Sequence, residues 1–294
     1  METYLLVLVA LIALVLVGRN QYRIWKKRKR NAQASRISAS TPVPEQLRII
    51  SPHYGLFSRT NHTEYVDFVK RWGGNAIRTF AYHEWDEGKF IPWDGSPANV
   101  TQLDRIREVI TTANERGIWI VLTLFQNNDG FGRDVVGRPR GELAEYIKKL
   151  VSGTADLATI YESTNEDDNH EFNLWVLGEI RKHIPEQSRR TCAYHNPALG
   201  ADWTNYHTGD LSKYDNRGFW RIILSNDTPS AIRGPSDEEY IRWIKEANAI
   251  QPIGSFEILT AWKRLSKGEE GFCGNDIPRM EAEWLRVLEA VRDL

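Results

Sequence analysis

The sequence predicts an α/β protein of the (β/α)8 TIM barrel class over residues 45–294. Short apolar runs alternate with amphipathic segments through this region, which is typical of a parallel sheet with helices between its strands. There are eight such runs, the number that closes a barrel. The run 118–125 is apolar apart from Thr123, as expected of a strand that is buried on both faces. An open doubly wound sheet is the structural alternative.

The expected elements follow one another along the chain. Strands are expected over 47–51, 75–82, 118–125, 157–163, 191–195, 203–207, 220–225 and 252–258. Helices are expected over 61–72, 101–116, 141–151, 172–183, 236–249 and 278–292. Gly73 and Gly117 end the first two helices, and Ser236 and Glu239 have capping-box spacing at the start of the fifth. Between residues 196 and 218 the pattern indicates crossovers that are short, irregular or absent.

Residues 1–44 differ from the rest of the chain in charge. They hold eight basic residues and one acidic residue, whereas the remainder holds 30 basic and 38 acidic residues. The acidic part has no basic face of the kind that nucleic acid requires, so no nucleic-acid partner is expected. Residues 32–44 are rich in serine, alanine and proline and lack periodicity. The expected organisation is therefore a transmembrane anchor at 1–18, a basic neck and Ser/Pro linker at 19–44, and one large domain at 45–294.

The anchor is expected from an unbroken apolar run between Tyr4 and Val17. A signal-peptide core, a short membrane anchor and a buried helix are the alternatives. The run is shorter than the roughly 20 residues that span a bilayer, which favours a signal peptide, but no basic residues precede it and no small-residue cleavage site follows. Lysine and arginine directly after it can extend a marginal span at a phospholipid surface. An uncleaved, single-pass membrane anchor is therefore favoured, and the positive-inside rule favours a cytoplasmic large domain.

The stretch 157–168 carries the chemistry that the sequence predicts. Its apolar strand runs into Asn165-Glu166 and an acidic turn, and a helical pattern begins at about His170. The carboxyl ends of parallel strands converge on one crevice, where catalytic residues are placed. Glu166 is therefore a catalytic candidate, and a solvated glutamate in an acidic loop is the alternative.

Asn165-Glu166 at the end of the fourth strand resembles the Asn-Glu signature of the clan A glycoside hydrolases, the cellulase-like barrels that include family 5. The resemblance implies that Glu166 is the general acid/base and that Asn165 binds the sugar hydroxyl next to the anomeric carbon. Arg78 on the second strand resembles the arginine that steadies the nucleophile, although a buried structural ion pair explains it equally well. His207 at the sixth strand end is similar to the histidine beside the catalytic carboxylates, and Tyr206 beside it is expected to contact substrate.

The second carboxylate departs from the family pattern. The segment 221–227 resembles the family's seventh strand, but Asn226 stands where the nucleophilic glutamate is expected, and a neutral amide is a very poor nucleophile. Glu257 on the neighbouring strand and Asp227 can compensate, with Glu257 favoured. A retaining mechanism, which needs carboxyl groups about 5 to 5.5 Å apart, is favoured over an inverting one, which needs about 6.5 to 9.5 Å.

Flat rings at the strand ends are expected to stack on sugars. The tryptophans at or after predicted strand ends are Trp85, Trp93, Trp203 and Trp262. The sequence has no glycine-rich phosphate loop, zinc-type helix or serine elbow, so no cofactor and no metal are expected.

The predicted function is hydrolysis of O-glycosidic bonds in a β-linked poly- or oligosaccharide. The alternative is a barrel that has lost catalysis and binds glycans, for which Asn226 is the main support. A cytoplasmic domain conflicts with a polysaccharide outside the cell, so the side of the membrane stays open. Nothing in the sequence indicates an oligomeric state.

Overall fold

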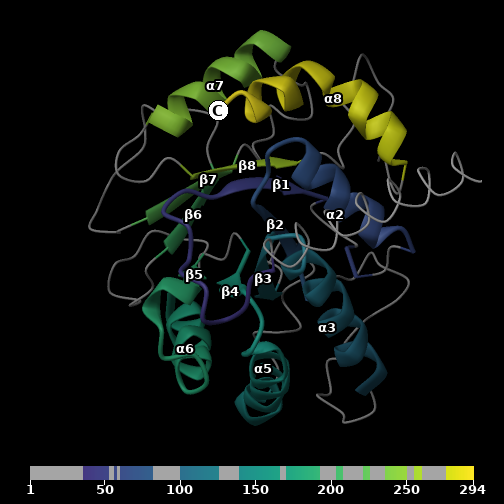
Figure 1. Cartoon of the computed structure of the whole chain (residues 1–294). Helices are drawn as coiled ribbons and strands as arrows, with labels where there is room; N and C mark the ends of the chain where they lie inside the picture. Colours follow the sequence, from purple (N-terminus) through teal and green to yellow (C-terminus); the bar gives the residue numbers. More distant parts are fainter. Residues whose placement is uncertain are drawn as a thin grey trace, which may run out of the picture. The chain divides into compact units, whose positions relative to one another are not determined.

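The computed structural model is a closed barrel of parallel strands (Figure 1). It describes residues 36–52, 56–57, 60–81, 100–125, 139–165, 170–192, 203–207, 221–225, 236–249, 255–259 and 276–294. Each strand pairs with the next in sequence, and β8 pairs with β1 to close the ring. The predicted barrel is confirmed, and the open doubly wound sheet is excluded.

The strands and helices lie close to the ranges that the sequence predicts. The strands are β1 (Arg48–Ser51), β2 (Ala76–Phe80), β3 (Trp119–Phe125), β4 (Thr159–Thr164), β5 (Arg190–Cys192), β6 (Trp203–His207), β7 (Arg221–Ser225) and β8 (Ser255–Leu259). The helices are α2 (His62–Arg71), α3 (Val100–Asn114), α5 (Arg140–Thr154), α6 (His170–Arg181), α7 (Asp237–Ala249) and α8 (Ile277–Arg292), with a 3-10 turn at Gln187–Arg189. In Figure 1 these helices lie outside the ring of strands.

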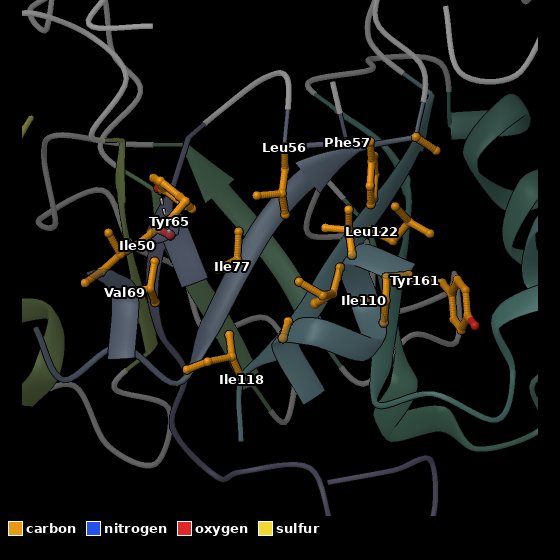
Figure 2. Packing of buried hydrophobic residues seen from close by; sticks show 14 of the residues in the cluster. Ile50, Leu56, Phe57, Tyr65, Val69, Ile77, Ile110, Ile118, Leu122 and Tyr161 are labelled. Atoms are coloured by element: carbon orange, nitrogen blue, oxygen red, sulfur yellow. Dashed lines mark hydrogen bonds between the residues drawn. The ribbon is translucent and has the colours of Figure 1, made fainter. Parts of the chain in front are cut away.

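The outer faces of the strands pack against the helices. Alternate strand residues point outward, so Ile50 of β1, Ile77 of β2 and Leu122 of β3 belong to one buried cluster with residues of α2 and α3 (Figure 2). On β4, Tyr161 is part of the same cluster, and its hydroxyl lies 2.9 Å from the hydroxyl of Thr154 on α5. Burial raises the pKa of Tyr161 to about 12, so this hydroxyl stays protonated and keeps its hydrogen bond across the neutral pH range.

The predicted helix ends are confirmed by the backbone. Gly73 and Gly117 have φ angles of 79° and 78°, in the left-handed region that side chains other than glycine rarely adopt. At the start of α7, the Ser236 amide donates to the Glu239 carboxylate at 2.7 Å and the Glu239 amide donates to the Ser236 hydroxyl at 3.3 Å. Hydrogen bonding to the carboxyl by Ser236, chiefly by its backbone amide and then by its side chain, holds the pKa of Glu239 below its ordinary value.

Asn114 at the end of α3 fixes the amino-terminal ends of β3 and β4. Its buried amide donates to the carbonyl oxygens of Ile118 and Ala158 at 3.0 and 3.2 Å, and its Oδ1 accepts from the Ala158 amide at 2.8 Å. One side chain thus satisfies three backbone groups where these two strands begin.

Residues 37–44 differ from the linker that the sequence predicts. The compact unit begins at Ile37. Ile37 and Val43 pack against the apolar residues that fill the barrel toward the amino-terminal ends of its strands. The Ile37 amide donates to the Asn114 carbonyl at 2.9 Å, and the Ala39 amide donates to the Asp156 carbonyl at 3.1 Å. The amino-terminal opening of the barrel is lined by apolar side chains, so a segment that covers it removes them from water.

The expected transmembrane anchor at 1–18 lies outside the described residues, as does the neck up to residue 35. Within the ranges that the structure describes, no helix combines the length and the apolar character needed to cross a bilayer.

The covering segment leads to a test of stability. We expect the double substitution Ile37→Ser/Val43→Ser to lower the free energy of unfolding by about 1 to 3 kcal/mol, because two partly buried apolar side chains are lost from the barrel floor. Urea denaturation measures this. Leu174→Ser, at a side chain that is 50% exposed, is the control and should change stability by less than about 0.5 kcal/mol. Equal effects from the two would contradict a role for 37–44 in closing the barrel.

Candidate active site

The inside of the barrel changes from apolar to charged along its length. Toward the amino-terminal ends of the strands the inner residues are Leu47, Ile49, Ala76, Trp119, Val121, Ala158 and Ile160. Two positions further along their strands stand Ser51, Arg78, Thr123 and Glu162, and β8 contributes Glu257 between two outward apolar residues. All five polar residues are at most 1% exposed. Burying charge is costly unless the charges are paired, so this polar layer has to be organised.

Arg78 organises the polar layer. Its Nε donates to Glu162 Oε2 at 2.7 Å, and its Nη2 donates to Asn165 Oδ1 at 2.7 Å. Its Nη1 lies 3.5 Å from Glu257 Oε2. The Thr123 hydroxyl donates to the same oxygen of Glu162. One guanidinium from β2 therefore holds groups from β4 and β8 together.

Both interpretations of Arg78 from the sequence find support in this geometry. Glu162 is the carboxylate partner that a buried structural arginine requires. Glu257, the favoured second carboxylate, lies beside the same guanidinium. The planar fork of an arginine suits it to contact two acceptor groups at once.

Asn165 is fixed immediately after β4. Its backbone amide donates to the Phe125 carbonyl at 2.9 Å, and its buried side chain faces Arg78. A guanidinium has donors and no acceptor, so the atom that faces it is the amide oxygen. The amide hydrogens of Asn165 are then the groups that it can offer to a ligand, and such a ligand has to present an acceptor oxygen.

Glu257 stands at the level where β7 ends. It is in register with Ser225, the last residue of β7, and with Ile49 of β1. Asn226 is the next residue in the chain after Ser225. The expectation that strands seven and eight are neighbours is thus confirmed, and Glu257 lies beside the strand end that carries the expected nucleophile position.

The other predicted site residues are described in part or not at all. Trp203, Tyr206 and His207 lie on β6, which pairs with β7, and the structure describes their backbone alone. Those outside the described residues are Glu166, Asn226, Asp227, Trp85, Trp93 and Trp262. Their roles stay predictions. Glu166 follows Asn165 directly in the chain.

Glu162 is a residue of the site that was not predicted from the sequence. Its signal is a charged residue inside the strand 157–163, with Ile160 two positions before it and Thr164 two positions after it on the same face. A carboxylate on the inner face of a buried strand needs a cation, and Arg78 is the buried arginine that needs an anion. Taken together, the two requirements predict an ion pair between Arg78 on the second strand and Glu162 on the fourth.

A metal site is not among the features of the described residues. In this part of the chain, no three or more histidine, cysteine, aspartate or glutamate side chains are grouped so as to hold an ion.

Comparison with solved structures identifies the fold. The cellulase Cel5C_n matches with a TM-score of 0.58 and 16% sequence identity over 87% of this chain and 87% of that one. A β-mannanase from the blue mussel Mytilus edulis matches with a TM-score of 0.56 and 13% identity over 84% and 91% of the two chains. A mannanase/glucanase of Prevotella bryantii matches with a TM-score of 0.51 and 10% identity, and this chain covers 43% of its length.

These likenesses show that the chain has the barrel fold of the family 5 glycoside hydrolases, as its resemblance to clan A implies. No protein-family model matches the sequence. No curated protein matches it either. At 10–16% identity these likenesses show the fold alone.

The polar layer leads to a prediction about stability. We expect Arg78→Met to lower the free energy of unfolding by about 3 to 5 kcal/mol, because it removes the cation that lies beside two buried carboxylates. Glu162→Gln should cost less, about 1 to 3 kcal/mol, because Arg78 still faces Glu257. Chemical denaturation at neutral pH measures both.

The control is an exposed ion pair, Lys182 with Glu179 on α6. Lys182→Met should change the free energy of unfolding by no more than about 1 kcal/mol. An Arg78→Met variant as stable as Lys182→Met would contradict the organising role of Arg78.

Proposed function

We propose that this protein is a glycoside hydrolase that cleaves O-glycosidic bonds of a β-linked poly- or oligosaccharide, with Glu166 as general acid/base. One observation carries the proposal. The Arg78 guanidinium contacts both Asn165, the residue before Glu166, and Glu257, the candidate second carboxylate. Glycoside hydrolysis needs two carboxylates that face one crevice, and this contact draws the two strand ends together.

Glu257 is the favoured second carboxylate. Its position in the polar layer supports the choice, because it lies beside Arg78, which also contacts the residue before Glu166. Asp227 is the competing candidate, since it follows the end of β7. A carboxylate close enough to Glu166 for direct attack gives retention, and a wider spacing that admits water gives inversion. We favour retention, with Glu257 as nucleophile.

The proposed substrate contacts surround these carboxylates. Arg78 and Asn165 lie in the polar layer, and Asn165 offers amide donors to a sugar oxygen. The remaining proposed contacts are Tyr206, His207, Asn226, Trp85, Trp93, Trp203 and Trp262. The tryptophans would stack on sugar faces. Structural neighbours are named for mannan, cellulose and xyloglucan, so β-mannan, β-glucan and xyloglucan are the first substrates to test.

The second candidate function is glycan binding without catalysis. Asn226 favours it, because an amide replaces the carboxylate that family enzymes use as nucleophile at that place. A binding barrel would hold the same glycans and release no product.

Hydrolysis is tested with the full chain and its Glu166→Gln variant on β-glucan, β-mannan, xyloglucan, xylan and chitosan, with reducing ends counted. We expect product from the parent, and at least about a 100-fold lower rate from Glu166→Gln, since the general acid is lost. Glu171→Gln, at an exposed glutamate in the first turn of α6, is the matched control and should keep the parental rate. Equal rates for the parent and Glu166→Gln would contradict the assignment.

Two further variants separate the carboxylates and the binding alternative. Glu257→Gln should abolish turnover if Glu257 is the nucleophile, whereas loss in Asp227→Asn alone would transfer that role to Asp227. A folded parent that binds a glycan in calorimetry but releases no product would establish the binding function. In that case Asn226→Glu is the variant that should gain activity.

We also propose that residues 1–18 form an uncleaved membrane anchor. The support is the apolar run from Tyr4 to Val17 and the basic residues that follow it. We expect the intact chain to stay with membranes after a carbonate wash, and recovery in the soluble fraction would contradict the anchor. Protease treatment of intact cells then reports the side: protection of the barrel means a cytoplasmic domain and an intracellular substrate, whereas digestion means that the positive-inside rule is misleading here.

A further inference from the structure

Asn173 ties the first turn of α6 to the end of β4. Its side chain is fully buried, and its Oδ1 accepts a hydrogen bond from Ser163 Oγ at 2.6 Å and another from Thr164 Oγ1 at 2.5 Å. Ser163 and Thr164 are the last two residues of β4. A shift of the helix start relative to the strand end would therefore break two buried hydrogen bonds at once.

These contacts lie on either side of Glu166. Residues 166–169 connect Asn165 to His170, the first residue of α6. At the strand end, Asn165 is fixed by the Phe125 carbonyl and by Arg78. At the helix end, Asn173 fixes α6 to the end of β4, the preceding strand. The residue before the four-residue connection is thus held by β2 and β3, and the helix after it is held by the end of β4.

We propose that Asn173 is a positioning residue that holds the start of α6 against the end of β4 and so fixes the segment that carries Glu166. The inference rests on the proposed role of Glu166. Asn173 lies on α6 and is hydrogen-bonded to the last two residues of β4. It would act through the ends of the connection and not through contact with the substrate.

The chemistry makes such positioning matter. A general acid has to lie within about 2.6 to 3.2 Å of the oxygen that it protonates. A displacement of about 1 Å can cost about 100-fold in rate. The loss should fall on substrates whose leaving group needs a proton, because a leaving group that departs as a stable anion does not depend on the acid.

The chain offers a matched control at the other end of β4. Asn114 is also a buried asparagine at the end of a helix, and it makes three hydrogen bonds at the starts of β3 and β4. Asn114→Ala removes three buried hydrogen bonds. It acts at the end of the barrel opposite Glu166, so it isolates loss of stability from loss of position.

The first measurement is amide hydrogen exchange of the full chain. We expect Asn173→Ala to raise exchange at least about tenfold in residues 164–170, relative to Asn114→Ala, with the two variants similar in the rest of the barrel. Thr164→Val is a milder second variant, since it removes one of the two donors and keeps the shape of the side chain. It should change exchange in the same residues by a smaller factor. Unchanged exchange at 164–170 in both Asn173→Ala and Thr164→Val would overturn the proposal.

The second measurement uses phenyl and 2,4-dinitrophenyl β-cellobiosides and β-mannobiosides. We expect Asn173→Ala to lower kcat on the phenyl glycoside by about 10-fold to 100-fold and to change KM little, because proton donation is impaired and binding is not. The burst of dinitrophenolate in the first turnover, which reports formation of the glycosyl-enzyme alone, should change in rate by less than about threefold, because Glu166 acts as base only in the later hydrolysis step. Asn114→Ala should leave the ratio of the two rates at the parental value. Equal losses on both substrates, or equal losses in both variants, would mean that Asn173 is structural only.

The two measurements separate the positioning role from the proposed function. A parent that hydrolyses none of these substrates would contradict the proposed function, while the exchange data still decide whether Asn173 holds the segment. If the parent hydrolyses a substrate but Asn173→Ala leaves exchange at residues 164–170 unchanged, the proposed function stands and the positioning role of Asn173 is contradicted.

Discussion

The buried guanidinium of Arg78 is the interaction on which the candidate site depends. A cation inside the barrel costs free energy unless anions and acceptors surround it, and Glu162, Asn165 and Glu257 do so at 2.7 to 3.5 Å. Glu162 lies on β4 and Asn165 directly after it, whereas Glu257 lies on β8. Their spacing can be satisfied only if β2, β4 and β8 keep the register that the closed barrel gives them.

The division of the barrel interior follows from this layer. Apolar residues fill the barrel toward the amino-terminal ends of the strands. Residues 37–44 cover that end and shield it from water. The polar layer lies nearer the carboxyl ends of the strands, where the connecting loops begin. Polar groups that cost stability are concentrated where a ligand could use them.

β4 is held at both ends by asparagine side chains. Asn114 satisfies its first backbone groups, and Asn173 accepts from its last two hydroxyls. Between these points, Glu162 joins the strand to Arg78, and Asn165 extends that contact to the residue before Glu166. The strand that carries the proposed acid is thereby tied to a helix at each end and to β2 across the interior.

The sequence predicts the elements well because each of them has a local signal. The run 118–125 is apolar because β3 is buried on both faces, and Gly73 and Gly117 mark helix ends that need positive φ. Such signals lie within a few residues of the element that they define. The identity of the barrel follows from their number and order.

Contacts between distant residues are what the sequence does not reveal. Arg78 and Glu162 are separated by 84 positions, and periodicity within either strand says nothing of the other. In the sequence, Asn173 looks like an ordinary polar residue of a helix. Its hydrogen bonds are to hydroxyl groups at the end of another element, β4, and the helical pattern does not reveal them. Ile37 and Val43 are hidden in a Ser/Pro-rich stretch, and their burial depends on an apolar opening that only the closed barrel creates.

The distance between the carboxyl groups of Glu166 and Glu257 tests the central claim most directly. A crystal structure of the Glu166→Gln variant with a bound oligosaccharide of the cleaved type would supply it, with the amide carbon of the substituted side chain standing for the carboxyl carbon. We expect about 5 to 5.5 Å, with the glycosidic oxygen between the two groups, which is the spacing of a retaining pair. A separation greater than about 10 Å lies outside both glycosidase geometries and would contradict the account.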